Sequence, residues 1–102
     1  MSAKDGQNAA VRRMTASFDG HVQGVGFRYT TIDLAADLNV RGFVRNEPNG
    51  SVTIVAEGSE KALMSLLNRV RSSHLGRHIM RDSVSWSGAT GEFPDFSVRY
   101  GG

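Results

Sequence analysis

Apolar and polar residues alternate from Met14 to Val22, which is the period of two expected of a strand with one buried face. After a connection that holds three glycines within seven residues, the pattern changes. Apolar residues then gather on one side of a helical wheel, opposite Thr30, Asp33 and Asp37. The first third of the chain therefore predicts a strand, a glycine-rich turn and a helix from about Phe27 to Leu38.

Two runs rich in β-formers follow, RGFVRN at 41–46 and GSVTIVAEG at 50–58, with Pro-Asn-Gly turn chemistry between them. They predict a β-hairpin. Ser59 is a suitable N-cap for a second helix, whose apolar residues recur at i, i+3, i+4 and i+7 from Leu63 to Val70. This helix is expected to end between Ser72 and Leu75, before Gly76.

Two more segments alternate like strands, separated by the loop SGATGEFPD. In IMRDSVSW, at 79–86, Met80, Val84 and Trp86 share one face. In FSVRY, at 96–100, the aromatic residues at both ends share a face with the valine. The complete order predicts a ferredoxin-like α+β sandwich, βαββαβ with a short extra C-terminal strand, in which an antiparallel sheet carries two helices on one face.

The length of 102 residues suits one domain, which we place at 13–102 after a flexible tail at 1–12. Apolar residues make up 39% and charged residues 22%, as in globular proteins. Without cysteine, disulfides and thiolate metal sites are excluded, and a reducing compartment such as the cytoplasm is expected. No apolar run approaches the roughly 20 residues of a membrane span, and a net charge of +2 suits a small anion as well as a polyanion.

The glycine-rich stretch GHVQGVGFR, at 20–28, is a candidate anion site. The first amides of a helix lack intrahelical partners, and glycine allows the positive φ angles that fold such amides into a concave nest. Arg28 adds a planar cation in the first helical turn, where the helix dipole disfavours it, and this conflict indicates a function. A tight connection beside an exposed arginine is an equally good interpretation of the spacing alone.

Asn46 is expected at the same end of the sheet as the glycine stretch. A helix of about 12 residues descends roughly 18 Å, and a strand from Arg41 to Asn46 climbs back about 17 to 20 Å. An uncharged amide beside a bound phosphoryl group can hold a water molecule for attack. The alternative is an asparagine that merely ends a strand before a turn.

At these residues the chain resembles the acylphosphatase family. That family's signature G-x-V-Q-G-V-x-F-R is matched from Gly20 to Arg28, and its segment G-x-V-x-N-x-x-[DG]-G-x-V is matched from Gly42 to Val52 apart from Asn49. The likeness spans roughly 14–100. It departs at His21, where arginine is common, at Asn39, where glycine is usual, and in the segment 72–86.

The resemblance implies an enzyme that hydrolyses the carboxyl–phosphate bond of acyl phosphates to a carboxylate and inorganic phosphate. It implies a water-orienting role for Asn46 and a phosphate cradle with Arg28 as its cation, formed by Gln23, Gly24, Val25, Gly26, Phe27 and Arg28. It implies a monomer that needs no metal or other cofactor and whose partners are a small acyl phosphate and phosphate, not nucleic acid or membrane.

Three alternatives remain. His74 and His78 have a metal-ligand spacing, but Gly76 lies between them and no third ligand has a recognisable spacing, which favours surface histidines. RNA-recognition domains share the expected fold, yet Phe43 is the only aromatic residue of RGFVRN and lies on the wrong strand. The third alternative is a catalytically idle or accessory relative, such as the acylphosphatase-like domain of carbamoyl-transferring maturation proteins.

Overall fold

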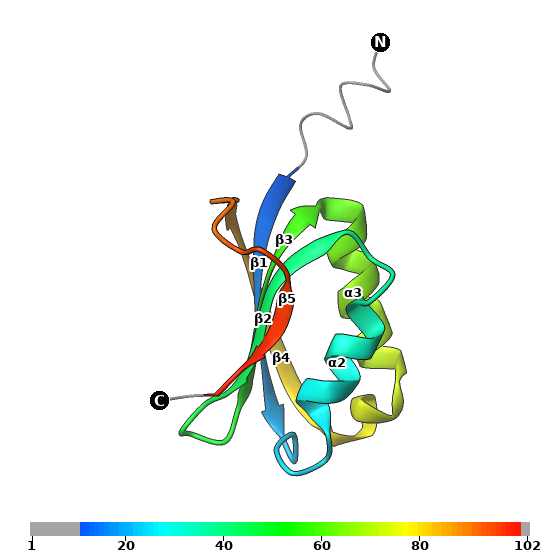
Figure 1. The fold of residues 1–102 in the computed structure, drawn as a ribbon. Helices are drawn as coiled ribbons and strands as arrows, with labels where there is room; N and C mark the ends of the chain where they lie inside the picture. Colours follow the sequence, from blue (N-terminus) through cyan, green and yellow to red (C-terminus); the bar gives the residue numbers. More distant parts are fainter. Residues whose placement is uncertain (1–10, 101–102) are drawn as a thin grey trace.

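The computed structural model describes residues 11–100 and has the predicted order of elements (Figure 1). The elements are β1 (Val11–Gly20), α2 (Phe27–Ala35), β2 (Val40–Asn46), β3 (Val52–Ser59), α3 (Glu60–Ser72), the 3₁₀ helix η1 (His74–His78), β4 (Ile79–Gly88) and β5 (Phe96–Arg99). Residues 1–10 of the expected tail lie outside the described residues. Val11 and Arg12, which were also assigned to the tail, open β1.

The strands form one sheet in the order β4-β1-β3-β2-β5, and both helices cover the same face of it (Figure 1). Neighbouring strands are antiparallel except for β5, which pairs with β2 in parallel. Because β3 separates β1 from β2, those two strands run in the same direction, and both end at the edge where α2 begins. The ferredoxin-like prediction is confirmed. No helix within residues 11–100 is long and apolar enough to cross a membrane.

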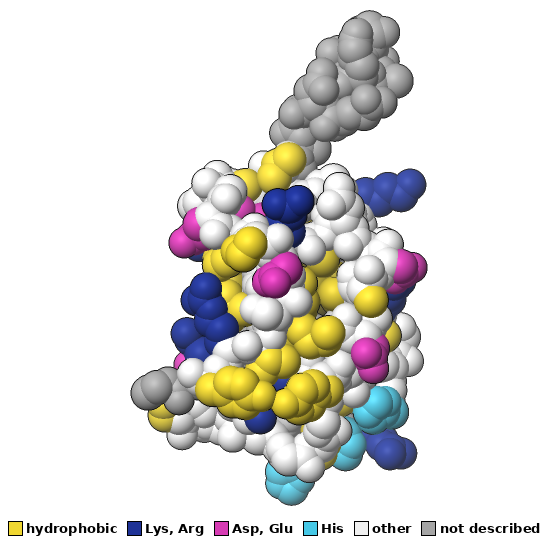
Figure 2. Space-filling view, viewed as in Figure 1, with side chains coloured by type: hydrophobic (Ala, Val, Ile, Leu, Met, Phe, Trp, Pro, Cys, Tyr) yellow, Lys and Arg dark blue, Asp and Glu magenta, His cyan; other side chains and the backbone are white. Residues whose placement is uncertain are grey.

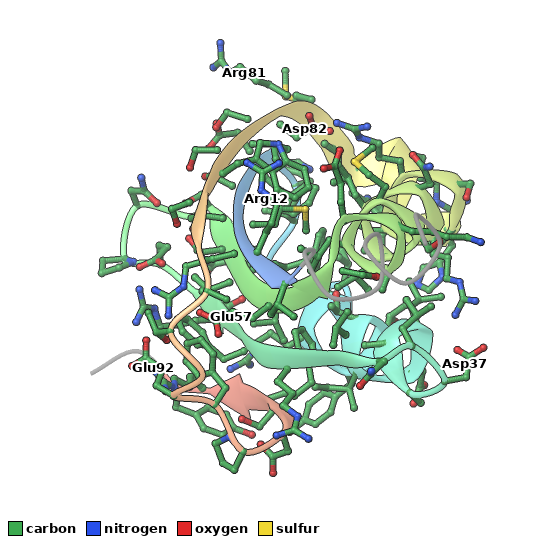
Figure 3. The ribbon with its side chains drawn as sticks, turned by 90° about the horizontal axis from the view of Figure 1, so that it is seen from above. Arg12, Asp37, Glu57, Arg81, Asp82 and Glu92 are labelled. Atoms are coloured by element: carbon green, nitrogen blue, oxygen red, sulfur yellow. The ribbon has the colours of Figure 1, made fainter. Side chains whose placement is uncertain are left out.

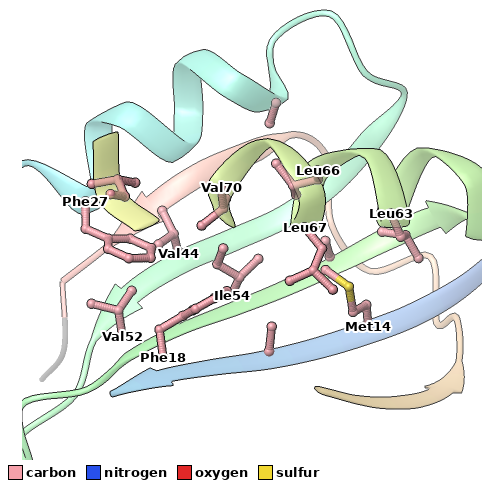
Figure 4. Close-up of a cluster of buried hydrophobic side chains, with 14 of the residues drawn as sticks. Met14, Phe18, Phe27, Val44, Val52, Ile54, Leu63, Leu66, Leu67 and Val70 are labelled. Carbon is pink, nitrogen blue, oxygen red and sulfur yellow. The ribbon is translucent and has the colours of Figure 1, made fainter. Parts of the chain in front are cut away.

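The core lies between the sheet and the helices (Figure 4). Every second residue of β1 and β3 points into it, which confirms the period of two. The apolar stripe of α3 covers these strands, and all four of its members are at most 2% exposed: Leu63, Leu66, Leu67 and Val70. The hydroxyl of Ser59 accepts the Ala62 amide at 3.1 Å, so the predicted N-cap is confirmed.

The bounds of β1 and α2 differ from the predictions. β1 begins at Val11 rather than Met14, because Val11 and Arg12 still pair with Ser59 and Gly58 of β3. It ends at Gly20 instead of Val22. α2 ends at Ala35 rather than Leu38, because the amides of Ala36 and Leu38 bond three residues back and tighten the chain into turns.

Met80 was predicted to share one face with Val84 and Trp86, and this was wrong. Its side chain is 86% exposed. The β1–β4 register shifts here, with Arg81 opposite Asp19 but Ile79 opposite Gly20, so Met80 is the extra residue of a bulge. A bulge reverses the face on which following residues point, which alternation alone cannot reveal.

At the far end of the sheet, the buried Glu57 fixes the β4–β5 loop. Its carboxylate accepts hydrogen bonds from the Thr90 and Gly91 amides, both at 2.9 Å, and from Arg13 Nε at 2.8 Å. Glu57 and the loop residue Glu92 both lie on the side of the sheet away from the helices (Figure 3). Burial alone would raise the pKa of Glu57, but these donors and the Thr90 hydroxyl outweigh it and lower the pKa to about 2.

Candidate functional site

The connection between β1 and α2 is an open loop built around glycine. Gly24 and Gly26 have φ angles of 82° and 78°, in the left-handed region that disfavours side chains. A Cβ atom added to either residue would meet nothing within 4 Å. The glycines are therefore required by backbone conformation, and no side chain of residues 11–100 fills the space within 4 Å of such an added atom.

Apolar side chains anchor this loop to the core. Val22 is fully buried, and Val25 is half-buried against the core. Phe27 is 2% exposed, and its ring centre lies 5.3 Å from that of Phe18. Val25 and Phe27, both expected in the phosphate cradle, thus contribute side chains to the core, which leaves only their backbone for a ligand.

The amides of the loop and of the start of α2 are unpaired. Gly26 is the N-cap of α2, no side chain caps the helix, and its first turn has no acidic residue. Among the residues that the structure describes, no acceptor is found for any backbone N–H from position 21 to 29. Unpaired amides at a helix N-terminus attract anions, and the dipole strengthens this attraction.

Arg28 lies half-buried beside these amides. Its guanidinium carbon is 5.0 Å from the centre of the Tyr100 ring, and the hydroxyl groups of Tyr29 and Tyr100 are 2.8 Å apart. The hydrogen bond with Tyr29 stabilises the protonated hydroxyl of Tyr100 and raises its pKa. No carboxylate of residues 11–100 lies within 4.0 Å of Arg28. Stacking occupies the face of the guanidinium, so its in-plane N–H groups can bind an anion.

Asn46 reaches the level predicted for it. Val52 of β3 pairs with Phe18 on one side and with Asn46 on the other, so Asn46 is level with the end of β1. Asn46 is two positions after the buried Val44 and six after the buried Val40. Because side chains alternate along a strand, Asn46 lies on the same face of the sheet as these valines, the face covered by the helices. Extending the β2–β5 register by one residue sets it beside Tyr100. The sheet thereby brings Asn46 to the end where Arg28 lies.

The β2–β3 turn is joined to the glycine loop by a contact that sequence reasoning missed. The side-chain amide of Gln23 donates to the carbonyl oxygens of Glu47 and Ser51, at 2.8 and 2.9 Å. Both the loop and the turn lie at the lower end of the molecule (Figure 1). Gln23 was expected to act through its backbone, and the motif gives no sign of these partners 24 and 28 residues away.

Asn49 replaces the acidic residue of the family pattern without loss of turn structure. Its side-chain oxygen accepts the Ser51 amide at 3.0 Å and the Ser51 hydroxyl at 2.7 Å. An aspartate oxygen can accept the same bonds, so this departure preserves the turn. Asn39, another departure, needs no glycine geometry, because no residue other than glycine has a positive φ within 11–100.

The acidic groups nearest the site face away from it. Glu47 follows Asn46, and its carboxylate binds Arg45, whose guanidinium stacks on Phe43 on the open face of the sheet. Thr53 and Arg45 lower the pKa of Glu47, which stays charged but paired. Asp19 alternates with the core residues of β1 and so lies on the open face of the sheet, where its carboxylate is 3.7 Å from Arg81 Nε. Neither of these two carboxylates faces the helix side of the sheet, where Arg28 and the amides lie.

The histidines lie at the same end of the molecule as the loop (Figure 2). His21 is exposed in the loop, while His74 and His78 bound η1. Gly20 packs directly on this segment, since an added Cβ would lie 2.3 Å from the His78 carbonyl oxygen. Within residues 11–100 no cluster of three or more His, Cys, Asp or Glu side chains could hold a metal.

The aromatic residues of the open sheet face do not form a stacking platform for bases. Phe43 and Phe93 are each 6% exposed and meet edge to face. Arg99 lies 4.1 Å over the Phe43 ring, and Arg13 lies 5.1 Å over Phe93. Bases need exposed ring faces for stacking, and these faces are covered by arginine, which argues against the RNA-binding alternative.

Comparison with known proteins shows which family the chain matches. The acylphosphatase family model matches residues 14–98. An acylphosphatase of Paenarthrobacter aurescens is 44% identical over 86 residues, covering 84% of this chain and 92% of that protein. The crystal structure of a Bacillus subtilis acylphosphatase is similar with a TM-score of 0.78 and 35% identity, over 87% of this chain and 99% of the other.

One similar structure is part of a much larger protein. Full-length HypF, solved in a phosphate- and nucleotide-bound form, matches 87% of this chain at 27% identity and a TM-score of 0.78. This chain covers only 12% of that protein. The same arrangement of strands and helices therefore occurs both in short chains and within a long one.

Proposed function

The chain belongs to the acylphosphatase family, whose members hydrolyse acyl phosphates, and we propose how its own residues carry out that reaction. The phosphoryl group binds at the loop 23–27 and Arg28, and a water molecule held by Asn46 attacks it in line with the departing carboxylate. The products are a carboxylate and inorganic phosphate, with water supplying the oxygen atom that phosphate gains.

The loop and Arg28 share the work of holding the phosphoryl group. Its three peripheral oxygens carry negative charge that spreads further in the transition state. The unpaired amides before and within the first turn of α2 supply donors that are already held in place by Val22 and Phe27. Arg28 adds a permanent charge whose planar fork matches two oxygens.

The departure of the carboxylate and the attack of water need few catalytic groups from the protein. The leaving carboxylate is the base of an acid with a pKa of about 4, so no general acid is required. Asn46 is neutral and can accept a hydrogen bond from water without repelling the phosphate. The reaction then depends on positioning and on charge stabilisation.

A single observation carries this proposal: within residues 11–100, the amides from position 21 to 29 have no protein acceptor and lie beside an arginine that meets no carboxylate. A purely structural connection would gain stability by pairing these groups. Their unpaired state supports a site whose partner is an anion from solution.

The test measures phosphate release from benzoyl phosphate in a buffer that contains a metal chelator. We expect hydrolysis unaffected by the chelator and competitive inhibition by inorganic phosphate. Asn46→Ala should lower kcat by about two orders of magnitude, on the scale of losing a positioned reactant, while the inhibition constant of phosphate stays within about twofold. Full turnover in a folded Asn46→Ala variant would contradict the proposed role of Asn46.

A further inference from the structure

The side chain of Gln23 uses both of its N–H groups on the β2–β3 turn. They donate to the carbonyl oxygens of Glu47, at 2.8 Å, and Ser51, at 2.9 Å. Carbonyl oxygens only accept hydrogen bonds, so the nitrogen of the Gln23 amide must face the turn. The chemistry of the partners thus fixes the orientation of this amide.

These two bonds connect segments that are otherwise separate. The turn is closed internally by the Glu47 amide on the Ser51 carbonyl, at 2.8 Å, and by the Gly50 amide on the Glu47 carbonyl, at 3.1 Å. Within the described part of the chain, only Gln23 provides hydrogen bonds between the loop 21–26 and the turn 46–51. Strand β3 lies between β1 and β2, so the sheet does not pair them directly.

The connection matters because the two segments carry different parts of the reaction. The loop would hold the phosphoryl group, whereas Asn46 immediately precedes Glu47, one of the two residues that Gln23 binds. In-line attack requires the water and the phosphorus atom to be placed within a fraction of an ångström, and an error of about 1 Å can cost 100-fold in rate.

We propose that the side chain of Gln23 is a positioning residue that sets Asn46, and the water it holds, at the correct distance from the phosphate loop. This proposal rests on the proposed function. The backbone amide of residue 23 belongs to the cradle and is retained by any substitution. The side chain acts separately, on the alignment of the two halves of the site.

The experiment replaces Gln23 by methionine, which keeps the length and neutrality of the side chain but cannot donate. We expect Gln23→Met to lower kcat for benzoyl phosphate by 10-fold to 100-fold, roughly the cost of misalignment. The inhibition constant of inorganic phosphate should change less than about twofold, because the cradle remains. Asn68→Met removes an exposed amide on α3 and should change neither quantity.

A double variant shows whether the effect passes through Asn46. In the Asn46→Ala background, Gln23→Met should lower kcat by less than about twofold, because residues that act as a unit are not additive. Independent, multiplying effects would overturn the proposal, and so would unchanged turnover in Gln23→Met or a parallel loss of phosphate affinity. Full turnover in Asn46→Ala alone would instead contradict the proposed role of Asn46 in the reaction. Reduced turnover in Asn46→Ala with unchanged turnover in Gln23→Met would contradict only the role of Gln23, so the two failures are distinguishable.

Discussion

Arg13 and Arg28 are placed alike over aromatic rings but differ in what else they meet. The guanidinium carbon of Arg13 lies 5.1 Å from the centre of Phe93, and that of Arg28 lies 5.0 Å from the centre of Tyr100. Arg13 also binds Glu57 and Glu92, which raise its pKa, whereas no carboxylate of residues 11–100 pairs with Arg28. One arginine is part of a closed network, and the other is open to an incoming anion.

Under the proposed function, this difference assigns stability to one end of the sheet and catalysis to the other. At the end of the sheet around Glu57, buried charge is matched by four donors, so the β4–β5 loop is fixed. At the other end, amides and a guanidinium are held by packing and stacking with their donors unused. Substitutions at the first end should affect unfolding, and those at the second should affect catalysis.

The largest expected difference comes from exchanging each arginine for glutamine. Arg28→Gln should lower kcat by about three orders of magnitude, the scale of an arginine contact to a transferring phosphoryl group, with little change in urea unfolding. Arg13→Gln should leave turnover per folded molecule within about twofold and lower the unfolding midpoint. If a folded Arg28→Gln variant releases phosphate as fast as the wild type, the contrast between a stabilising Arg13 and an anion-binding Arg28 is wrong.

Glu57→Ala tests the stabilising end directly. It leaves Arg13 and the Thr90 and Gly91 amides without their acceptor, so we expect the free energy of unfolding to fall by about 4 kcal/mol. Urea unfolding at pH 7 measures this change. Glu92→Ala is the matched control, because its carboxylate is 55% exposed and should matter little. Equal destabilisation by both variants would show that the burial of Glu57 does not determine its contribution to the free energy of unfolding.

The pKa of Glu57 makes this end sensitive to acid. The pKa is about 2 in the folded protein and about 4.5 in the unfolded chain, so the ionised group stabilises the fold above pH 4.5 and loses this effect as the pH falls toward 2. The stability difference between the wild type and Glu57→Gln should therefore narrow across that window by up to about 3 kcal/mol. A constant difference in urea unfolding from pH 7 to pH 3 would contradict the role of these donors.

Local patterns were enough to predict most of the fold. The alternation of β1, the cap at Ser59 and the turn chemistry before Gly50 each depend on neighbours in sequence, and the structure confirms them. The level of Asn46 also followed from helix and strand lengths, because topology fixes how far each element travels. These features need no knowledge of distant partners.

The features that were missed depend on distant contacts. Glu57 fits the alternation of a strand, and its partners Thr90 and Gly91 lie 33 and 34 residues away. Gln23 stands within the motif, but its side chain reaches the β2–β3 turn, which only the assembled sheet brings near. Met80 leaves its predicted face because of a bulge set by pairing with β1. Side-chain networks and register shifts arise from tertiary structure, so sequence periodicity cannot supply them.

The smallest expected effect concerns the ring that supports Arg28. Tyr100→Leu removes the aromatic face, so the guanidinium loses its fixed plane, and the inhibition constant of phosphate should rise about threefold, the scale of an exposed cation–π contact. Tyr100→Phe keeps the face and loses only the bond to Tyr29, so it should change this constant less than about twofold. Tyr29→Phe breaks the same bond from the other side and should match Tyr100→Phe. If the inhibition constant of phosphate is the same for Tyr100→Leu and the wild type, stacking on Tyr100 does not help Arg28 to bind phosphate. The availability of the guanidinium then depends only on the lack of a carboxylate partner within residues 11–100.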